Sequence, residues 1–332
     1  MQIPFFGGAK IGDKAPELVG ITSWINSKSL TIEDLKGKVV IVDFWAFSCI
    51  NCIRTLPYMK AWHETYSSYG LVIIGVNTPE FAFEKDPEKV EVAVKKFEIS
   101  YPVAVDSNMK TWNAYESNCW PNKFLIDANG IICFNQKGEG HYKEFEGHIR
   151  ELLQEKIQRE KQKTLLENFS NPKNVVPVNP FLVWTPEIYL GYEFSRQELG
   201  NVEGFNPEEI VHYKLPKVIP SGKPCLQGEW KNNRDNMELI SKEGKIVLKY
   251  TARAVNIVAG ADKEVELEVL KDGKRLTEKD KGWDVKIIKG DPECFVRDYR
   301  MYSLIFDQDA GSHTIEIIVR DDTFKIFTFT FG

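Results

Sequence analysis

Two cysteines separated by two residues, Cys49 and Cys52, stand between an apolar run and an amphipathic segment. Residues 39–45 (VVIVDFW) are β-branched and aromatic, too few for a helix, and typical of a central strand. Apolar residues then recur at steps of three and four from Ile53 to Tyr66, which predicts an amphipathic helix. We therefore expect the cysteine pair at a strand-to-helix turn, where the helix begins.

This position has a chemical consequence for both thiols. The unpaired N–H groups and the macrodipole at a helix N-terminus stabilise a thiolate, so we expect the pKa of Cys49 to fall below the usual ~8.5. The Cys49 thiolate can attack a substrate disulfide, and Cys52, one turn further on and more buried, can resolve the mixed disulfide. The pattern predicts a thiol-disulfide oxidoreductase that acts on protein thiols and disulfides, with the Cys49–Cys52 disulfide in place of any cofactor.

Two other types of site share part of this pattern. A CxxC pair also forms half of a zinc knuckle, but no second CxxC or HxxxH completes it, and Cys119 and Cys133 stand singly. We therefore predict no metal site. A peroxiredoxin-like peroxidase is a lesser alternative, because such enzymes need a lone peroxidatic cysteine preceded by a Pro and Thr pattern, whereas residues 45–48 (WAFS) precede Cys49.

Strand and helix patterns alternate through the first half of the chain. The alternation predicts a mixed sheet covered by helices on both faces. After the cysteine helix, the expected elements are a strand at 71–76, a helix that begins with Asp86-Pro87, a strand at 101–105, a helix at 109–115, a hairpin of 123–127 and 131–135 around Asn129-Gly130, and a last helix from about Phe145.

The length of 332 residues predicts two domains. We expect an α/β domain at 11–160, a linker and interdomain segment at 161–224, where X-Pro pairs break regular structure, and an all-β sandwich at 225–332. The sandwich, jelly-roll-like, is predicted from short runs of two-residue alternation separated by turn residues.

Residues 42–46 (VDFWA) followed by 49–52 (CINC) resemble the strand and active-site turn of the thioredoxin superfamily. The resemblance implies a thioredoxin-like fold for the α/β domain and a buried acid at Asp43, six residues before the first cysteine. A carboxyl in an apolar strand is desolvated and has a raised pKa, which suits it to accept the Cys52 proton. Residues 71–76 contain no lysine, so the sequence shows no cationic partner for Asp43.

The same family has a cis-proline that faces the cysteines, and Pro121 occupies the matching place. The residue before it, Trp120, then offers a free backbone edge to which a substrate peptide can add as a short strand, although core packing is an equal interpretation of its side chain. We expect Trp120, Pro121 and Trp45 to bind substrate. Cys119, two residues before the proline, is a candidate third redox participant.

An inserted helical segment at 78–100 and the sequence at 37–40 (GKVV) resemble the TlpA/ResA-like branch of the superfamily. Residues 185–193, 228–230 and 329–332 extend the likeness to the soluble C-terminal part of DipZ-type proteins, where a thioredoxin-like domain precedes a sandwich similar to carbohydrate-binding modules. This resemblance leaves open an alternative function: a carbohydrate- or protein-binding module with a vestigial redox unit. The candidate sugar-stacking rings are Trp230, Trp283, Tyr299 and Tyr302, and the sandwich is also a candidate homodimer contact.

Charge and apolar runs limit the partners and the compartment. The formal net charge of −5 gives no basic excess for nucleic acid. The first residues show no signal-peptide pattern, and the apolar runs are shorter than the ~18 residues of a membrane helix. We expect a cytoplasmic location for the chain as written, and an extracytoplasmic one if the precursor has a longer N-terminus; there Cys225 and Cys294 could pair. The upstream reductant and the direction of electron flow are not readable, since CxxC proteins span about −270 to −120 mV.

Overall fold

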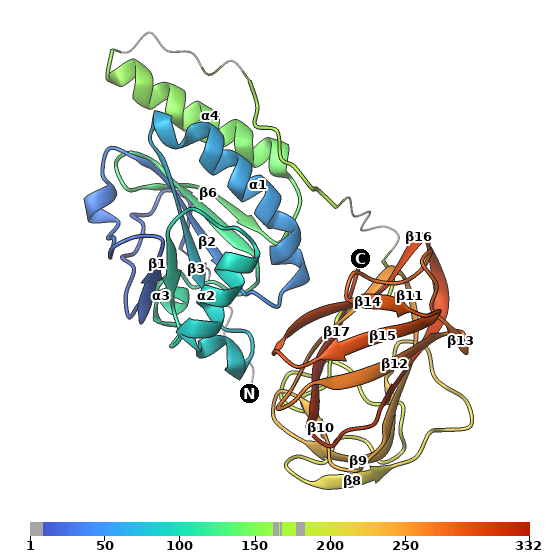
Figure 1. The fold of residues 1–332 in the computed structure, drawn as a ribbon. Helices are drawn as coiled ribbons and strands as arrows, with labels where there is room; N and C mark the ends of the chain where they lie inside the picture. Colours follow the sequence, from blue (N-terminus) through green and yellow to red (C-terminus); the bar gives the residue numbers. More distant parts are fainter. Residues whose placement is uncertain (1–8, 162–165, 167, 177–182) are drawn as a thin grey trace. The chain divides into compact units, whose positions relative to one another are not determined.

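The structure is a computed structural model that describes residues 9–161, 166, 168–176 and 183–332. The chain divides into two compact units, Met1–Val176 and Pro177–Gly332 (Figure 1). Strands β7 (Ile188–Tyr189) and β8 (Ile210–Tyr213) are hydrogen-bonded to strands of the second unit. This part of the expected segment 161–224 therefore belongs to the second unit and is not a linker. Its strands have two and four residues, too few to show a sustained alternation of apolar and polar residues in the sequence.

The first unit is built on a six-stranded mixed sheet in the order β1-β4-β3-β2-β5-β6. Strands β2, β3 and β4 are parallel, while β1 and the β5–β6 hairpin run antiparallel to their neighbours. Their bounds are β1 Ser23–Ile25, β2 Val39–Trp45, β3 Leu71–Asn77, β4 Val103–Val105, β5 Asn122–Ile126 and β6 Ile132–Lys137. The predicted α/β thioredoxin-like sheet is confirmed, with β2 at its centre.

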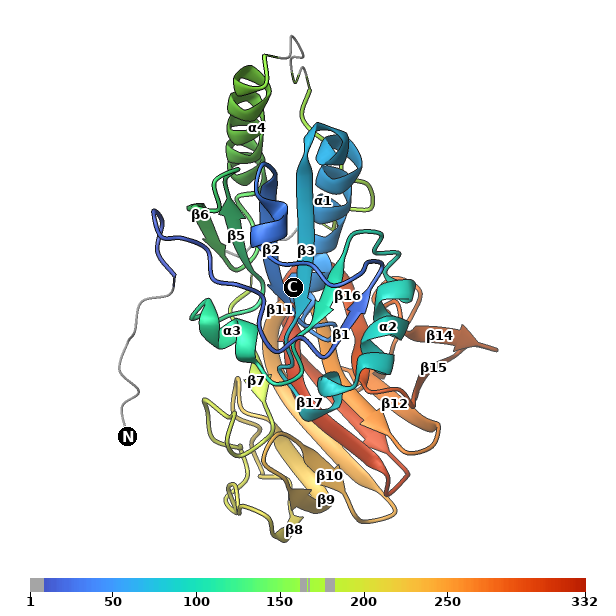
Figure 2. The same ribbon diagram turned by 90° about the vertical axis from the view of Figure 1, so that its left-hand side faces the viewer.

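Helices cover both faces of this sheet. The α-helices are α1 Ile50–Tyr66, α2 Pro87–Lys96, α3 Lys110–Ala114 and α4 Tyr142–Arg159, and the 3₁₀ helices are η1 Glu33–Leu35, η2 Ser67–Tyr69 and η3 Ala82–Lys85. Apolar side chains of α1, α2 and α4 pack with one face of the sheet, and those of α3 and η1 pack with the other. Helices α1 and α4 lie side by side (Figures 1 and 2), so β2 is buried from both sides.

A buried carboxylate joins α4, α1 and the chain that follows α4. Glu146 accepts hydrogen bonds from Trp62 Nε1 at 3.1 Å and from the Tyr66 hydroxyl at 2.6 Å, both on α1. The backbone N–H and hydroxyl of Ser170 donate to the same carboxylate at 2.5 and 3.0 Å. Stacking of Trp62 on Phe145, with ring centroids 5.2 Å apart, completes the contact. Glu146 thereby fixes the end of the first unit against α1.

The second unit is all-β, as predicted. Two long strands, β11 Gly244–Ala261 and β16 Arg300–Val319, pair with each other through register shifts near Ala252 and Val255. One part of β11 pairs with β9 and another part with β17, so the strands enclose a single apolar core. The remaining bounds are β9 Cys225–Asn232, β10 Met237–Leu239, β12 Val265–Lys271, β13 Lys274–Arg275, β14 Val285–Ile288, β15 Asp291–Val296 and β17 Phe324–Phe331.

Cys225 and Cys294 are separate thiols in this unit. They lie on β9 and β15, and both are free and buried. The pairing that the sequence leaves open for an oxidising compartment is not made in this structure. Within the described residues no helix is long and apolar enough to cross a membrane.

The Glu146 contact leads to a stability prediction. Replacement by Gln keeps the size of the side chain but turns one acceptor into a donor that faces the donors of α1 and Ser170. We expect Glu146→Gln to lower the free energy of unfolding of the first unit by about 1–3 kcal/mol. Denaturant unfolding followed by tryptophan fluorescence measures this change, and hydrogen exchange at the Ser170 amide should accelerate. Unchanged unfolding and exchange would contradict it.

Candidate functional site

The cysteine pair lies where β2 ends and α1 begins. Cys49 is the N-cap residue of α1, and its sulfur accepts the backbone N–H of Cys52 at 3.3 Å. The Cys49 N–H in turn donates to the carbonyl of Ala46 at 3.3 Å, which closes the turn. Cys49 is 8% exposed, against 1% for Cys52. The less buried of the two cysteines is therefore the one whose sulfur accepts an N–H group at the helix start.

Asp43 lies on β2, on the face of the sheet that α1 covers. It is 2% exposed, and its Oδ1 has no hydrogen-bond partner among the described residues. Burial raises the pKa of Asp43 from its ordinary 3.8 to about 7, while the charge of Lys123 opposes the shift. A carboxyl with this pKa can take up and release a proton near neutral pH.

Burial also raises the pKa of the Cys52 thiol well above its usual value, and the hydrogen bond and charge of Cys49 act in the same direction. The charge of Asp43 raises it further. Cys52 is thus a protonated thiol that needs a base before it can act as a nucleophile. The structure brings that thiol and the buried carboxyl Asp43 into electrostatic contact.

The cationic partner of Asp43 is Lys123, which the sequence analysis did not identify. It lies on β5 directly opposite Asp43 in the antiparallel register, and it is fully buried. Its ammonium donates to the carbonyl of Gly138 at 3.0 Å. Burial lowers the pKa of Lys123, whereas Asp43, Cys52 and Cys119 oppose that shift. The available signal was a lysine in phase with Leu125 inside the strand predicted at residues 123–127.

Position 75 explains why no lysine comes from β3. Gly75 is the other register partner of Asp43. A Cβ at this glycine would lie 3.1 Å from Trp45 Nε1 and 3.2 Å from the Tyr101 ring. Trp45 fills this space and is only 1% exposed, so its side chain belongs to the core, and its expected role in binding substrate stays a prediction.

An ion pair between Arg54 and Glu139 joins the start of α1 to the loop after β6. Arg54 donates to both carboxylate oxygens of Glu139, at 2.9 and 2.7 Å, and to Asn51 Oδ1 at 2.5 Å. Asn51 lies between the two cysteines, and Glu139 follows Gly138, the residue whose carbonyl accepts from Lys123. The loop 138–139 therefore contacts both the cysteine turn, through Arg54 and Asn51, and the buried Lys123.

The Trp120–Pro121 peptide bond is cis, immediately before β5. Pro121 is buried, and Trp120 is half-buried. The Trp120 ring stacks on Trp112 with centroids 4.3 Å apart, and its Nε1 donates to the Thr78 carbonyl at 3.1 Å. This side chain therefore packs within the unit, as one of its two interpretations expected. Cys119 is half-buried, and burial raises the pKa of its thiol.

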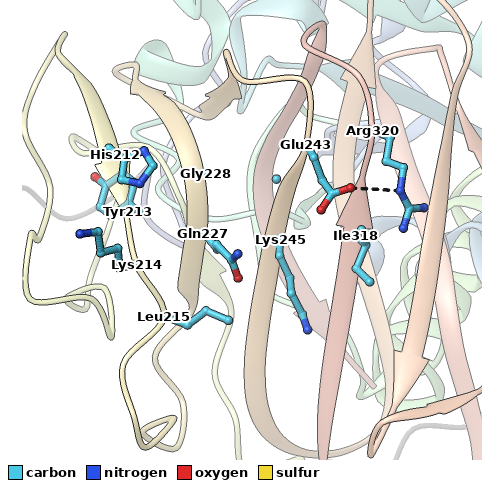
Figure 3. Close-up of a pocket in the computed structure, with 11 residues that line it drawn as sticks. His212, Tyr213, Lys214, Leu215, Gln227, Gly228, Glu243, Lys245, Ile318 and Arg320 are labelled. Carbon is cyan, nitrogen blue, oxygen red and sulfur yellow. Dashed lines mark hydrogen bonds and ion pairs between the residues drawn. The ribbon is translucent and has the colours of Figure 1, made fainter.

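The rings considered for sugar stacking differ in exposure. Trp230 and Tyr302 are buried in the core of the second unit, whereas Trp283 is 59% exposed and Tyr299 is half-buried. A hollow of about 600 Å³ in this unit is lined mainly by polar residues on and next to β8, β9, β11 and β16 (Figure 3). Two of its cations are paired: Lys245 with Glu316, and Arg320 with Glu243 and Glu268.

Two family models match the chain. Residues 11–134 match the AhpC/TSA family, and residues 185–332 match a family described as thioredoxin like C-terminal domain. The second match covers most of the all-β unit, including β7 and β8. It therefore agrees with the assignment of these two strands to the second unit.

Curated relatives extend these matches. Protein DipZ of Mycobacterium bovis is 32% identical over 96% of this chain, and the chain spans 43% of DipZ. The thiol-disulfide oxidoreductase ResA of Bacillus cereus is 31% identical over 43% of this chain, which covers 79% of ResA. A solved structure of a thiol-disulfide isomerase from Corynebacterium glutamicum is 27% identical over 42% of this chain and 96% of its own, with a TM-score of 0.39. From the sequence relatives, the chain belongs to the thioredoxin-like family that contains the thiol-disulfide oxidoreductase ResA.

Proposed function

We propose that this protein exchanges disulfides with protein substrates through Cys49 and Cys52. The observation that carries the proposal is the arrangement of the pair: a less buried cysteine at the N-cap of α1, a more deeply buried thiol one turn later, and a buried carboxyl with a pKa of about 7. The relatives support the same chemistry. No organic cofactor is required, because the disulfide itself carries two electrons.

The reaction proceeds in two exchanges. The Cys49 thiolate attacks one sulfur of a substrate disulfide; that S–S bond breaks, a mixed disulfide forms, and the other substrate sulfur leaves as a thiolate. Cys52 then loses its proton and attacks the Cys49 sulfur. The mixed disulfide breaks, the second substrate sulfur leaves, and the Cys49–Cys52 disulfide forms. The substrate gains two electrons that the protein loses, and the reverse sequence oxidises a dithiol substrate.

Asp43 accepts the Cys52 proton in the second exchange, and Lys123 keeps the Asp43 pKa low enough for this. Burial alone pushes the carboxyl toward its neutral form, and the opposed lysine limits that shift. The cis peptide before Pro121 leaves the backbone of Trp120 as the edge on which a substrate strand pairs. Trp120 contributes its backbone here, since its ring packs on Trp112.

The lesser alternative, a peroxidase, is the competing enzymatic activity to test, because residues 11–134 match the AhpC/TSA family. Such an enzyme uses one cysteine to reduce a peroxide, with formation of a sulfenic acid. The position of Cys52, whose N–H donates to the Cys49 sulfur, instead favours direct resolution of a mixed disulfide. Consumption of hydrogen peroxide by the reduced protein, at a rate above that of disulfide reduction, would favour the peroxidase.

The roles of the two cysteines predict different trapped species. Cys52→Ser should accumulate a mixed disulfide with a disulfide-containing protein such as insulin, because Cys49 attacks and nothing resolves the product. Cys49→Ser should accumulate none, because the remaining thiol is buried and protonated. Non-reducing electrophoresis and mass spectrometry measure both. Equal trapping by the two variants would overturn the assignment.

The pKa of Asp43 predicts a pH-dependent stability. The folded unit holds the Asp43 proton up to about pH 7, whereas the ordinary carboxyl pKa is 3.8, so ionised Asp43 destabilises the fold. The free energy of unfolding of wild type, relative to Asp43→Asn, should therefore fall as pH rises from about 4 to about 7, by up to roughly 4 kcal/mol. Denaturant unfolding at several pH values measures this difference. A difference that does not depend on pH would contradict it.

The charge of Lys123 leads to a prediction about the pH dependence of the second exchange, in which Cys52 resolves the mixed disulfide. Lys123→Met removes the charge that lowers the Asp43 pKa. The midpoint for release of the second substrate thiol should move up by about one pH unit or more. Single-turnover measurement of that release across pH tests the shift. Lys137→Met, which removes an exposed lysine on β6, is the control and should leave the midpoint in place. An unchanged midpoint in Lys123→Met would show that Lys123 does not influence the second exchange.

A further inference from the structure

A buried carboxylate from a neighbouring segment is hydrogen-bonded to the turn that carries Cys49. Glu84, in η3, accepts hydrogen bonds from the backbone N–H of Ser48 at 3.0 Å and from its hydroxyl at 2.9 Å. Its second oxygen accepts the backbone N–H groups of Glu80 at 2.8 Å and Phe81 at 3.2 Å. Glu84 and Ser48 are both fully buried, and Ser48 directly precedes Cys49.

The surroundings of Glu84 suit an ionised carboxylate. Burial raises the pKa of Glu84, and the hydrogen bonds from Ser48, Glu80 and Phe81 oppose that shift. Three N–H groups and one hydroxyl face its two oxygens, and charge-assisted bonds of this kind are stronger than neutral ones. A buried carboxylate without such donors would be costly. The four bonds are therefore the reason why a charge can stay behind the cysteine turn.

Apolar contacts join the same two segments. The rings of Phe47, in the turn, and Phe83, in η3, lie with centroids 5.8 Å apart. Phe83 also stacks on Phe81 at 5.7 Å. Phe47 is 4% exposed, and Phe83 is partly buried against the same core. The segment between β3 and α2 is thus packed against the residues immediately before Cys49 as well as hydrogen-bonded to them.

We propose that Glu84 is a positioning residue that sets the redox equilibrium of Cys49 and Cys52 by acting through Ser48. The inference rests on the proposed thiol-disulfide exchange. A turn fixed at Ser48 holds the Cys49 sulfur close to Cys52, which favours formation of the disulfide over two separate thiols. A negative charge near Cys49 also disfavours its thiolate, and so the reduced form. Both effects stabilise the disulfide and make the dithiol a stronger reductant.

The test is the equilibrium of the full chain with glutathione. Oxidised glutathione and the Cys49–Cys52 dithiol give two reduced glutathione molecules and the protein disulfide, so the ratio of forms reports the equilibrium constant. Glu84→Gln removes the charge and replaces one acceptor by a donor. We expect its equilibrium to shift about fivefold or more toward the dithiol. Ser48→Ala removes only the hydroxyl bond and should shift it in the same direction by less. Thiol alkylation and mass spectrometry measure the ratio.

Glu146→Gln is the matched control. Glu146 is also a buried carboxylate that accepts several hydrogen bonds, but its α1 partners are Trp62 and Tyr66, ten or more residues beyond Cys52. This variant should lose stability and keep the wild-type equilibrium with glutathione. An equal shift in Glu146→Gln would show that general loosening, and not the contact with Ser48, causes the effect, and would overturn the proposal.

The remaining outcomes are also decisive. A folded Glu84→Gln protein with the wild-type equilibrium overturns the role of Glu84. If Glu84→Gln does not fold, Ser48→Ala decides: a shift toward the dithiol supports the role, and the wild-type ratio overturns it. A wild-type protein that forms no Cys49–Cys52 disulfide in any glutathione mixture overturns the proposed function itself, and this result is distinct from an altered ratio in one variant.

Discussion

The burial of one carboxyl under the start of α1 is the interaction on which the rest of the site depends. Asp43 lies in the central strand of the sheet, where both faces are covered, and it is almost completely removed from water. Desolvation raises its pKa into the neutral range, and the proposed transfer of the Cys52 proton rests on this shift. A more exposed carboxyl would be a weaker base, and a carboxyl without Lys123 would hold its proton more tightly.

The source of that lysine links two parts of the site. Gly75 leaves no room for a side chain on β3, because Trp45 and Tyr101 occupy the space beside it. The cation therefore comes from β5, the strand that begins directly after Pro121. The backbone edge of Trp120, proposed for substrate pairing, and the charge of Lys123, which lowers the pKa of Asp43, thus belong to one short segment of the chain. The loop 138–139 supports that piece through Lys123 and contacts the cysteine turn through Arg54.

The fold of the first unit could be predicted from local patterns, whereas the partners within the site could not. The spacing of Cys49, Cys52 and Asp43 is local in the sequence, so it was sufficient for their positions. Lys123 and Glu84 reach the site only through strand order and through the packing of an inserted segment, which no local pattern reports. Trp45 is in phase with Asp43, which places its side chain on the face of β2 that α1 covers, within the core. The segment 161–224 was misassigned in part because β7 and β8 are very short strands.

The low exposure of Cys49 has a consequence for the shape of its partners. Only 8% of the residue meets solvent, so in the proposed exchange little of Cys49 is open to a substrate sulfur. A disulfide recessed in a rigid partner has less access to such a site than one on a protruding or unfolded chain. Under the proposed function, the rate of exchange would therefore depend on how far a partner's disulfide projects, and partly folded chains would react before compact ones of the same sequence.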